Sequence, residues 1–487
     1  MWPVIGHPLE FPHGAWANPA RSPSTSERGV IRYLAIVDGE HYPPVVEAAL
    51  TDLQRSGHEV PAAVMVGGSE KLPAGGVAEY GSVPVVTGPD HRDLLDRAIR
   101  DYGPDAIIDM SDEPVLDYRR RHELAALSLF RGIPYIGADF RFDPPPRPRL
   151  AARPTLAIIG TGKRTGKTAV AGFVARTLVA AGSKPVVVAM GRGGPEDPEV
   201  LRGDELSLTP RDLVAMADAG RHSASDYVED AMLARVPTVG CRRCGGGLAG
   251  GVDTSNVAAG VEVANGIPGD ITLLEGSGSS IPPVHADATI LIVPASIPVE
   301  YLAGYMGPYR LLLADFVLVT MSEEPFGSSS RISTISSLVR NAWRPHEPGD
   351  EKGKIQVVRT VFRPTPTRSI EGATVFVATT APEAAGDPIT RHLEEVHRCD
   401  VVGVSHSLSD RTRLMQELET AMERGPQVLL CEIKAAGIDV ATRWALDEGI
   451  EVAFMDNEPL GVDGDDPAAV VHRAAELAGQ RYGEQQS

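Results

Sequence analysis

The stretch that decides the fold is TLAIIGTGKRTGKT, residues 155–168. It starts as a short apolar run, turns at three glycines and ends in Gly-Lys-Thr, and a helical pattern then continues to Ala181. A buried strand, a glycine-rich turn and a helix in that order are typical of a phosphate-binding P-loop. Backbone N–H groups of such a loop, together with the helix N-terminus, point at phosphate oxygens. The stretch therefore predicts a nucleotide-binding α/β unit.

The loop residues have predicted roles in binding ATP. Lys167 can neutralise β- and γ-phosphate oxygens, and the Thr168 hydroxyl can bind Mg²⁺. The residues predicted to hold ATP are Gly160, Thr161, Gly162, Thr165, Gly166, Lys167 and Thr168.

The loop is longer than the standard form, because five residues separate Gly160 from Gly166. This variant resembles the loop of dethiobiotin synthetase and its relatives, ligases that use ATP to close a ring or an amide. Partner-gated ATPases of the same broad class carry a signature lysine where this chain has Gly162. The spacing therefore disfavours a dimer-gated switch.

Short apolar runs alternate with helical patterns along most of the chain, which predicts parallel α/β sheets. We expect a central P-loop domain flanked by N- and C-terminal α/β domains. The predicted division is a disordered extension over 1–30, an N-terminal α/β domain over 31–143, a Pro-rich linker over 144–153, a P-loop ATP-binding and catalytic domain over 154–342 and a C-terminal α/β domain over 355–480.

Composition excludes several classes of function. The 46 Lys and Arg against 65 Asp and Glu give a formal net charge of −19, so the chain has no general attraction for nucleic acid. No run approaches the ~20 apolar residues that span a bilayer. Four cysteines in 487 residues cannot form a disulfide framework, which favours a cytoplasmic location.

A second acidic motif follows the P-loop in the sequence. DITLLEGSG, residues 270–278, is an apolar strand that ends in a carboxylate and a glycine-rich turn. P-loop enzymes hold Mg²⁺ with such a strand-end carboxylate, so Glu275 is the candidate metal ligand. The alternative is an ordinary strand-end carboxylate, and Asp204 is a weaker candidate ligand.

Two further loops place arginine beside glycine. They are GRGGP, residues 191–195, and GCRRCGGG, residues 240–247. Glycines let backbone amides approach an anion, and guanidinium groups pair with phosphate in bidentate fashion. The predicted substrate-binding residues are Arg192, Gly193, His222, Arg242 and Arg243. The alternative is that these arginines and the histidine are ordinary surface side chains. We interpret Cys241 and Cys244 as small side chains in a tight loop rather than as a zinc site.

Taken in order, the motifs resemble the cyclic 2,3-diphosphoglycerate synthetase family. The resemblance covers nearly the whole chain after residue 30. In the central unit it rests on GTGKRTGKTAVAG, MGRGGPEDPEV, GRHSASDYVEDA, GCRRCGGGLAGG, LLEGSGSSIPP and VLVTMSEEP. It continues through IVDGEHYPPVV in the N-terminal unit and VFRPTP, VFVATTAP and CEIKAAGIDV in the C-terminal unit. It implies an ATP-dependent ring closure that joins the two phosphates of 2,3-diphosphoglycerate and releases ADP and phosphate.

The resemblance and the motifs together suggest roles for the side chains. We expect Lys167 and Thr168 to serve ATP and Mg²⁺, with Glu275 on the metal. Lys163 and Arg164 would bridge between ATP and substrate. The three arginines and His222 would hold the two substrate phosphates together against their repulsion.

Two other functions stay open: another ATP-dependent ring-closing or amide-forming ligase, and a P-loop ATPase switch with protein partners. The outer units are less informative. Residues 38–42 and 432–434 lie at predicted strand ends. These strand ends either line a ligand-binding crevice or are capped strand ends that bind no ligand. Alternatively, these units form subunit contacts, as in a homodimer.

Overall fold

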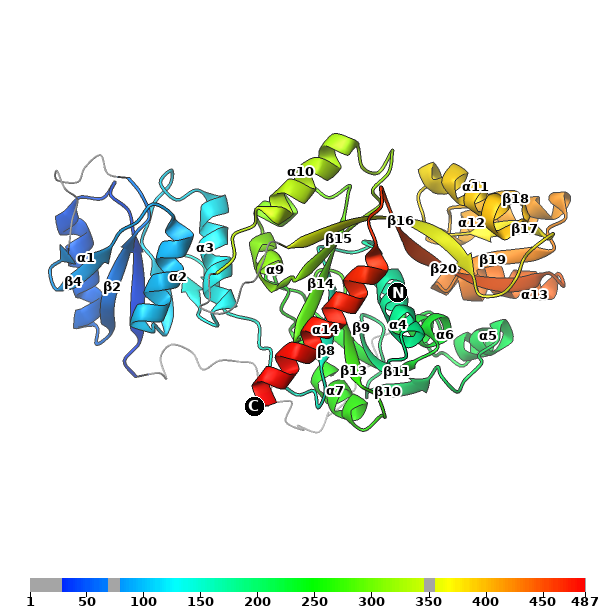
Figure 1. Ribbon diagram of the computed structural model, residues 1–487, viewed down its shortest axis with the longest axis horizontal. Helices are drawn as coiled ribbons and strands as arrows, with labels where there is room; N and C mark the ends of the chain where they lie inside the picture. The colour runs from blue at the N-terminus through cyan, green and yellow to red at the C-terminus, as the bar shows by residue number, and fades with distance from the viewer. Residues whose placement is uncertain (1–28, 69–78, 346–354, 487) are drawn as a thin grey trace, which may run out of the picture.

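The computed structural model describes residues 29–68, 79–345 and 355–486, so nearly all of the predicted extension over residues 1–30 lies outside the described residues. Figure 1 shows an N-terminal unit, a central unit and a C-terminal unit arranged side by side in that order. Both sheets carry helices, and parallel strand pairs predominate. The predicted α/β class, with a central P-loop unit between two others, is confirmed.

The N-terminal unit contains the first sheet, with seven strands in the order β3-β4-β2-β1-β5-β6-β7. The strands are β1 Arg32–Val37, β2 Glu59–Met65, β3 Glu79–Tyr80, β4 Val83–Val86, β5 Ala106–Asp109, β6 Tyr135–Ile136 and β7 Arg141–Phe142. The helices are α1 Pro43–Arg55, α2 His91–Tyr102 and α3 Tyr118–Phe130. Strand β1 pairs in parallel with β2 on one side and β5 on the other.

The second sheet has thirteen strands and runs through both remaining units. Its order is β10-β11-β9-β13-β8-β14-β15-β16-β20-β19-β17-β18, and β12 pairs with β11 outside this path. The strands of the central unit are β8 Thr155–Gly160, β9 Pro185–Gly191, β10 Glu199–Arg202, β11 Pro237–Cys244, β12 Thr254–Ser255, β13 Ile271–Glu275, β14 Ala288–Pro294 and β15 Phe316–Thr320. The others are β16 Gln356–Pro366, β17 Thr374–Ala378, β18 Asp400–Ser405, β19 Val428–Glu432 and β20 Glu451–Gly461.

Helices surround this sheet (Figure 1). In the central unit they are α4 Lys167–Ala180, α5 Pro210–Asp218, α6 Asp226–Ala234, α7 Val257–Asn265, α8 Glu300–Ala303, α9 Gly307–Leu313 and α10 Ser329–Arg340. Those that follow are η1 Glu383–Ala385, α11 Gly386–His397, α12 Arg411–Ala421, η2 Met422–Arg424, η3 Gly437–Thr442, α13 Arg443–Asp447 and α14 Pro467–Gln486. Every residue of β8, β9, β13, β14 and β15 is buried, as expected for parallel strands covered on both faces.

Strand β16 joins the central and C-terminal units. Its first residues pair in parallel with β15, and from Thr360 onward it pairs antiparallel with β20. Strand β20 runs antiparallel to β16, back toward the central unit, and β19 runs parallel to β20. The carboxyl ends of the C-terminal strands therefore point toward the carboxyl edge of the central sheet. The two strand-end edges therefore face each other.

The last helix, α14, returns to the central unit, where the Arg481 guanidinium lies 2.9 Å from the Asp315 carboxylate. On the other side of the central unit, helix α3 packs against α9, and Arg119 pairs with Glu300 at 3.1 Å. No helix among the described ranges is long and apolar enough to cross a membrane.

Candidate active site

The P-loop closes tightly around the lysine that begins α4. Gly166 caps the helix in the left-handed region, at φ 87°, where glycine carries no steric cost. The Lys167 ammonium donates to the Gly162 carbonyl at 2.9 Å and to Thr165 Oγ1 at 3.3 Å. The Thr320 hydroxyl at the end of β15 donates to the Thr165 carbonyl at 3.0 Å. A hydrogen bond from the end of β15 thus helps to hold the loop in place.

Lys163 and Arg164 are exposed at the rim of the loop. Arg164 adopts a left-handed backbone conformation, at φ 60°. Both predicted bridging residues are thus solvent-exposed beside the loop.

Two buried carboxylates lie beside Thr168. Glu275 is 2% exposed at the end of β13, and it accepts a hydrogen bond from the Thr168 hydroxyl. Asp230 of α6 is equally buried and interacts directly with Glu275. Burial, and secondarily the charge of Asp226, raises the pKa of Glu275 to about 8. Burial likewise raises the pKa of Asp230 well above its ordinary value.

Asp226 and Asp230 are site residues that sequence reasoning did not assign. Asp226 begins α6, which follows the predicted His222 segment, and Asp230 lies one helical turn further along the same helix. Asp226 acts electrostatically on both Lys167 and Glu275. A Ser N-cap followed by acidic residues was a visible signal for a helix start, but the direction in which that helix points depends on the tertiary fold.

Two of the predicted arginines converge near Lys167. A Cβ atom added to Gly278 would lie 2.5 Å from Arg192 Nη2 and 3.3 Å from Arg243 Nη2. Burial lowers the pKa of Lys167 to about 8, and the positive charges of Arg192 and Arg243 contribute to that decrease. Arg243 donates to the Ser277 carbonyl at 2.8 Å and to the Gly245 carbonyl at 2.6 Å. These bonds fix it across the turn that follows Glu275.

Arg242 is separated from this pair, although it is adjacent to Arg243 in the chain. Successive side chains of a strand point to opposite faces. The Arg242 guanidinium lies 3.9 Å from the Glu196 carboxylate, and its backbone N–H donates to Asn256 Oδ1 at 2.7 Å. The structure thus brings Arg192 and Arg243 together and leaves Arg242 outside.

The other predicted residues lie around this centre or away from it. A Cβ atom added to Gly193 would lie 3.0 Å from His222 Nε2, so these two exposed residues are neighbours. Asp204 lies apart and pairs with Arg202 at 2.6 Å. Cys241 is buried and Cys244 is exposed, without a disulfide between them. In the described part of the chain, no group of three or more His, Cys, Asp or Glu side chains is arranged to hold a metal ion by itself.

The C-terminal unit reaches the P-loop. The Phe362 ring packs so closely on Gly166 that an added Cβ atom would lie 2.2 Å from it. Strand-end Glu432 is buried and accepts hydrogen bonds from Thr379, Thr380 and Asn457. In the N-terminal unit, Asp38 similarly accepts from the backbone of residues 40, 41 and 112. Both strand-end carboxylates are therefore satisfied by the protein itself.

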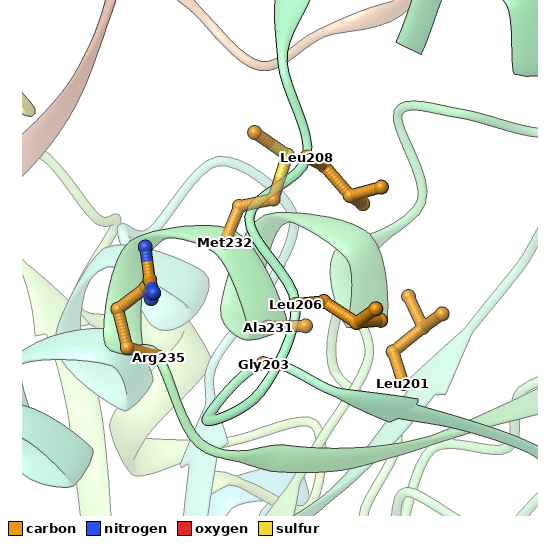
Figure 2. Close-up of a pocket in the computed structure, with 7 residues that line it drawn as sticks. All are labelled: Leu201, Gly203, Leu206, Leu208, Ala231, Met232 and Arg235. Atoms are coloured by element: carbon orange, nitrogen blue, oxygen red, sulfur yellow. The ribbon is translucent and has the colours of Figure 1, made fainter. Parts of the chain in front are cut away.

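Neither of two surface hollows contains the predicted site. A small cavity of about 30 Å³ lies against α6. Figure 2 shows its lining residues, which are apolar except for Arg235. Its lining is Leu201, Gly203, Leu206, Leu208, Ala231, Met232 and Arg235. A cleft of about 680 Å³ lies at the opposite, amino ends of β14 and β15, beside linker residues Arg147 and Arg149. The convergent polar groups lie instead at the carboxyl edge of the central sheet.

Comparison with known proteins gives consistent matches along the chain. Residues 155–346 match the model of the cyclic 2,3-diphosphoglycerate synthetase P-loop domain. Residues 32–143 and 366–458 match the N-terminal and C-terminal domain models of the same synthetase.

Whole-length relatives carry the same name. The cyclic 2,3-diphosphoglycerate synthetase of Rubrobacter xylanophilus is 45% identical over 437 residues, which cover 89% of this chain and 96% of the relative. That of Methanothermobacter thermautotrophicus is 43% identical over 439 residues, covering 88% and 92%. A crystal structure of a DUF1611 family protein from Anabaena variabilis covers 78% of this chain and 95% of its own, at 12% identity with a TM-score of 0.16, too weak a likeness to carry an argument.

Proposed function

The chain belongs to the cyclic 2,3-diphosphoglycerate synthetase family, and on that premise we propose that it uses ATP to close 2,3-diphosphoglycerate into its cyclic anhydride, releasing ADP and phosphate. One observation carries the proposal: two guanidinium groups, Arg192 and Arg243, converge within electrostatic reach of the P-loop lysine. Joining two mutually repelling phosphates requires such a concentration of positive charge.

The chemistry has two steps. An oxygen of one substrate phosphate attacks the γ-phosphorus of ATP, and the bond between that phosphorus and the ADP oxygen breaks. An oxygen of the second substrate phosphate then attacks the activated phosphorus of the first, which closes the ring and expels inorganic phosphate. Both steps depend on positioning and charge neutralisation more than on a nucleophilic side chain. Lys167 and the loop amides would neutralise the ATP phosphates, while Arg192 and Arg243 hold the substrate.

The carboxylates beside Thr168 fit a divalent cation. Glu275 Oε2 and Asp230 Oδ2 are buried and have no hydrogen-bond partner. Buried carboxylate oxygens are costly unless a proton or a cation neutralises them. We propose that Thr168, Glu275 and Asp230 hold Mg²⁺, which when bound would neutralise phosphate charge. All four cysteines are unpaired, which supports our proposal of a reducing, cytoplasmic setting.

Phosphorus NMR tests the function directly. Full-length protein is incubated with ATP, Mg²⁺ and 2,3-diphosphoglycerate, and we expect a new cyclic anhydride signal that grows together with ADP and inorganic phosphate. Release of ADP without that signal would overturn the proposal and favour a ligase that acts on another acceptor. An ATPase rate that small phosphorylated acids leave unchanged, but a partner protein stimulates, would instead favour the switch.

A further inference from the structure

An ion pair links the C-terminal unit to α6 of the central unit. Lys434, just beyond β19, places its ammonium 2.5 Å from the Glu229 carboxylate. Glu229 is 8% exposed, whereas the lysine side chain is about a third exposed (32%). The pair lies where the two strand-end edges face each other. Nothing in the roles assigned so far uses this lysine.

Glu229 lies on the helical turn that carries the site acids. Residues three and four apart on a helix share a face, so Glu229 stands beside Asp226, and Asp230 follows it directly. Asp230 interacts directly with Glu275, which lies beside Thr168. The turn held by Lys434 is therefore the turn that brings carboxylates to the candidate metal site.

The same turn concentrates negative charge. Burial raises the pKa of Glu229 to about 7, and the charges of Asp226 and Asp456 add to the effect, while Lys434 opposes it. Burial disfavours a charged Lys434, but the neighbouring Glu229, Glu432 and Asp226 together raise its pKa above the ordinary value. The Lys434 ammonium thus lies against the acidic turn and offsets repulsion among its carboxylates.

We propose that Lys434 is a positioning residue of the synthetase: through Glu229 it fixes the first turn of α6, so that Asp226 and Asp230 stay beside Thr168 and Glu275. The inference rests on the proposed function, because it assigns a task to the C-terminal unit within that reaction.

The expected consequence is a change in metal requirement. Without the lysine, the ion pair that holds Glu229 is lost and the acidic turn is free to move outward, so its carboxylates are less well placed and Mg²⁺ binds less tightly. We expect Lys434→Met to raise the Mg²⁺ concentration for half-maximal rate about tenfold, the effect of roughly 1.4 kcal/mol. The KM for 2,3-diphosphoglycerate at saturating Mg²⁺ should change less than about twofold, because the lysine does not contact the substrate.

The chain provides a matched control. Arg443 of α13 pairs with Asp218 of α5 at 2.6 Å, which also joins the two units, but at an exposed place away from the acidic turn. Arg443→Met should leave the Mg²⁺ requirement unchanged. Lys434→Arg keeps the positive charge and should have a Mg²⁺ requirement close to that of the wild type. If Lys434→Met does not fold, Lys434→Gln keeps a hydrogen-bond donor to Glu229 without the charge and should show the same increase.

Three outcomes would overturn the inference. In the first, Lys434→Met and Lys434→Gln have the Mg²⁺ requirement of the wild type. In the second, Arg443→Met raises the Mg²⁺ requirement equally, which would indicate that any ion pair between the two units has this effect. In the third, only the KM for substrate rises, which would make Lys434 a substrate contact. Failure of the proposed function is distinguishable, because the wild type would then form no cyclic product. In that case the increase in thermal midpoint on adding Mg²⁺, compared between the wild type and the same variants, would still test whether Lys434 supports Mg²⁺ binding.

Discussion

Comparing Arg243→Ala with Arg242→Ala tests whether only one face of β11 binds the substrate. Arg243 is held across the turn after Glu275 by two carbonyls, and its Nε atom is buried without a hydrogen-bond partner. Arg242 points away from the site toward Glu196. The account therefore assigns adjacent, chemically identical residues to different tasks.

The magnitude follows from what each guanidinium contacts. A hydrogen bond to a charged group contributes about 1.5–3 kcal/mol, so losing one phosphate contact at Arg243 should raise the substrate KM roughly ten- to 150-fold. Arg242 forms one long surface contact, and such pairs contribute about 0–1 kcal/mol, so its loss should change the KM less than about fivefold.

Steady-state kinetics measure both effects. The rate of cyclic product formation is followed against 2,3-diphosphoglycerate at saturating ATP, and then against ATP at saturating substrate. We expect Arg243→Ala to raise mainly the KM for 2,3-diphosphoglycerate. A loss confined to ATP affinity would show that Arg243 serves the nucleotide, and equal effects of the two alanines would refute the division between the faces.

Three further predictions concern the P-loop and its neighbouring acid. Gly166→Ala should lower both the thermal midpoint and ATP affinity, because alanine is strained at φ 87° and its Cβ would meet the Phe362 ring, 2.2 Å away; an unchanged midpoint in calorimetry would contradict this. Lys167→Ala should abolish turnover while circular dichroism shows the fold retained, and residual product formation above a few per cent would refute its role. Because burial raises the pKa of Glu275 from 4.5 to about 8, its contribution to apo stability is full below pH 4.5 and is lost as the pH rises through about 8. The thermal midpoint of metal-free protein should thus fall more steeply between about pH 5 and 8 in the wild type than in Glu275→Gln, whereas parallel profiles would argue against a protonated Glu275.

Features encoded locally could be predicted from the sequence. The strand, glycine turn and helix around Lys167 are contiguous, and the predicted helix from Thr168 to Ala181 differs from α4 by one residue at each end. The position of Glu275 at the end of a buried strand could be predicted, because a strand-end carboxylate needs only a strand assignment. The period of two in a strand also places Arg242 and Arg243 on opposite faces of β11.

Features that depend on tertiary pairing could not be predicted. The polar break over residues 343–350 resembles a boundary, and yet β16 beyond it pairs first with β15 and then with β20. No local pattern in Gln356–Pro366 reveals this change of partner. For the same reason the approach of Lys434 to Glu229, 205 residues earlier in the chain, was invisible from the sequence.

The central claim is that Lys167 and the pair Arg192 and Arg243 act on one cluster of phosphates. A crystal structure with ADP, Mg²⁺ and 2,3-diphosphoglycerate tests it most directly. The account predicts ADP phosphates on the loop around Lys167, with substrate phosphate oxygens within hydrogen-bond distance of both arginines. Substrate bound elsewhere, or arginines that contact no phosphate, would contradict it.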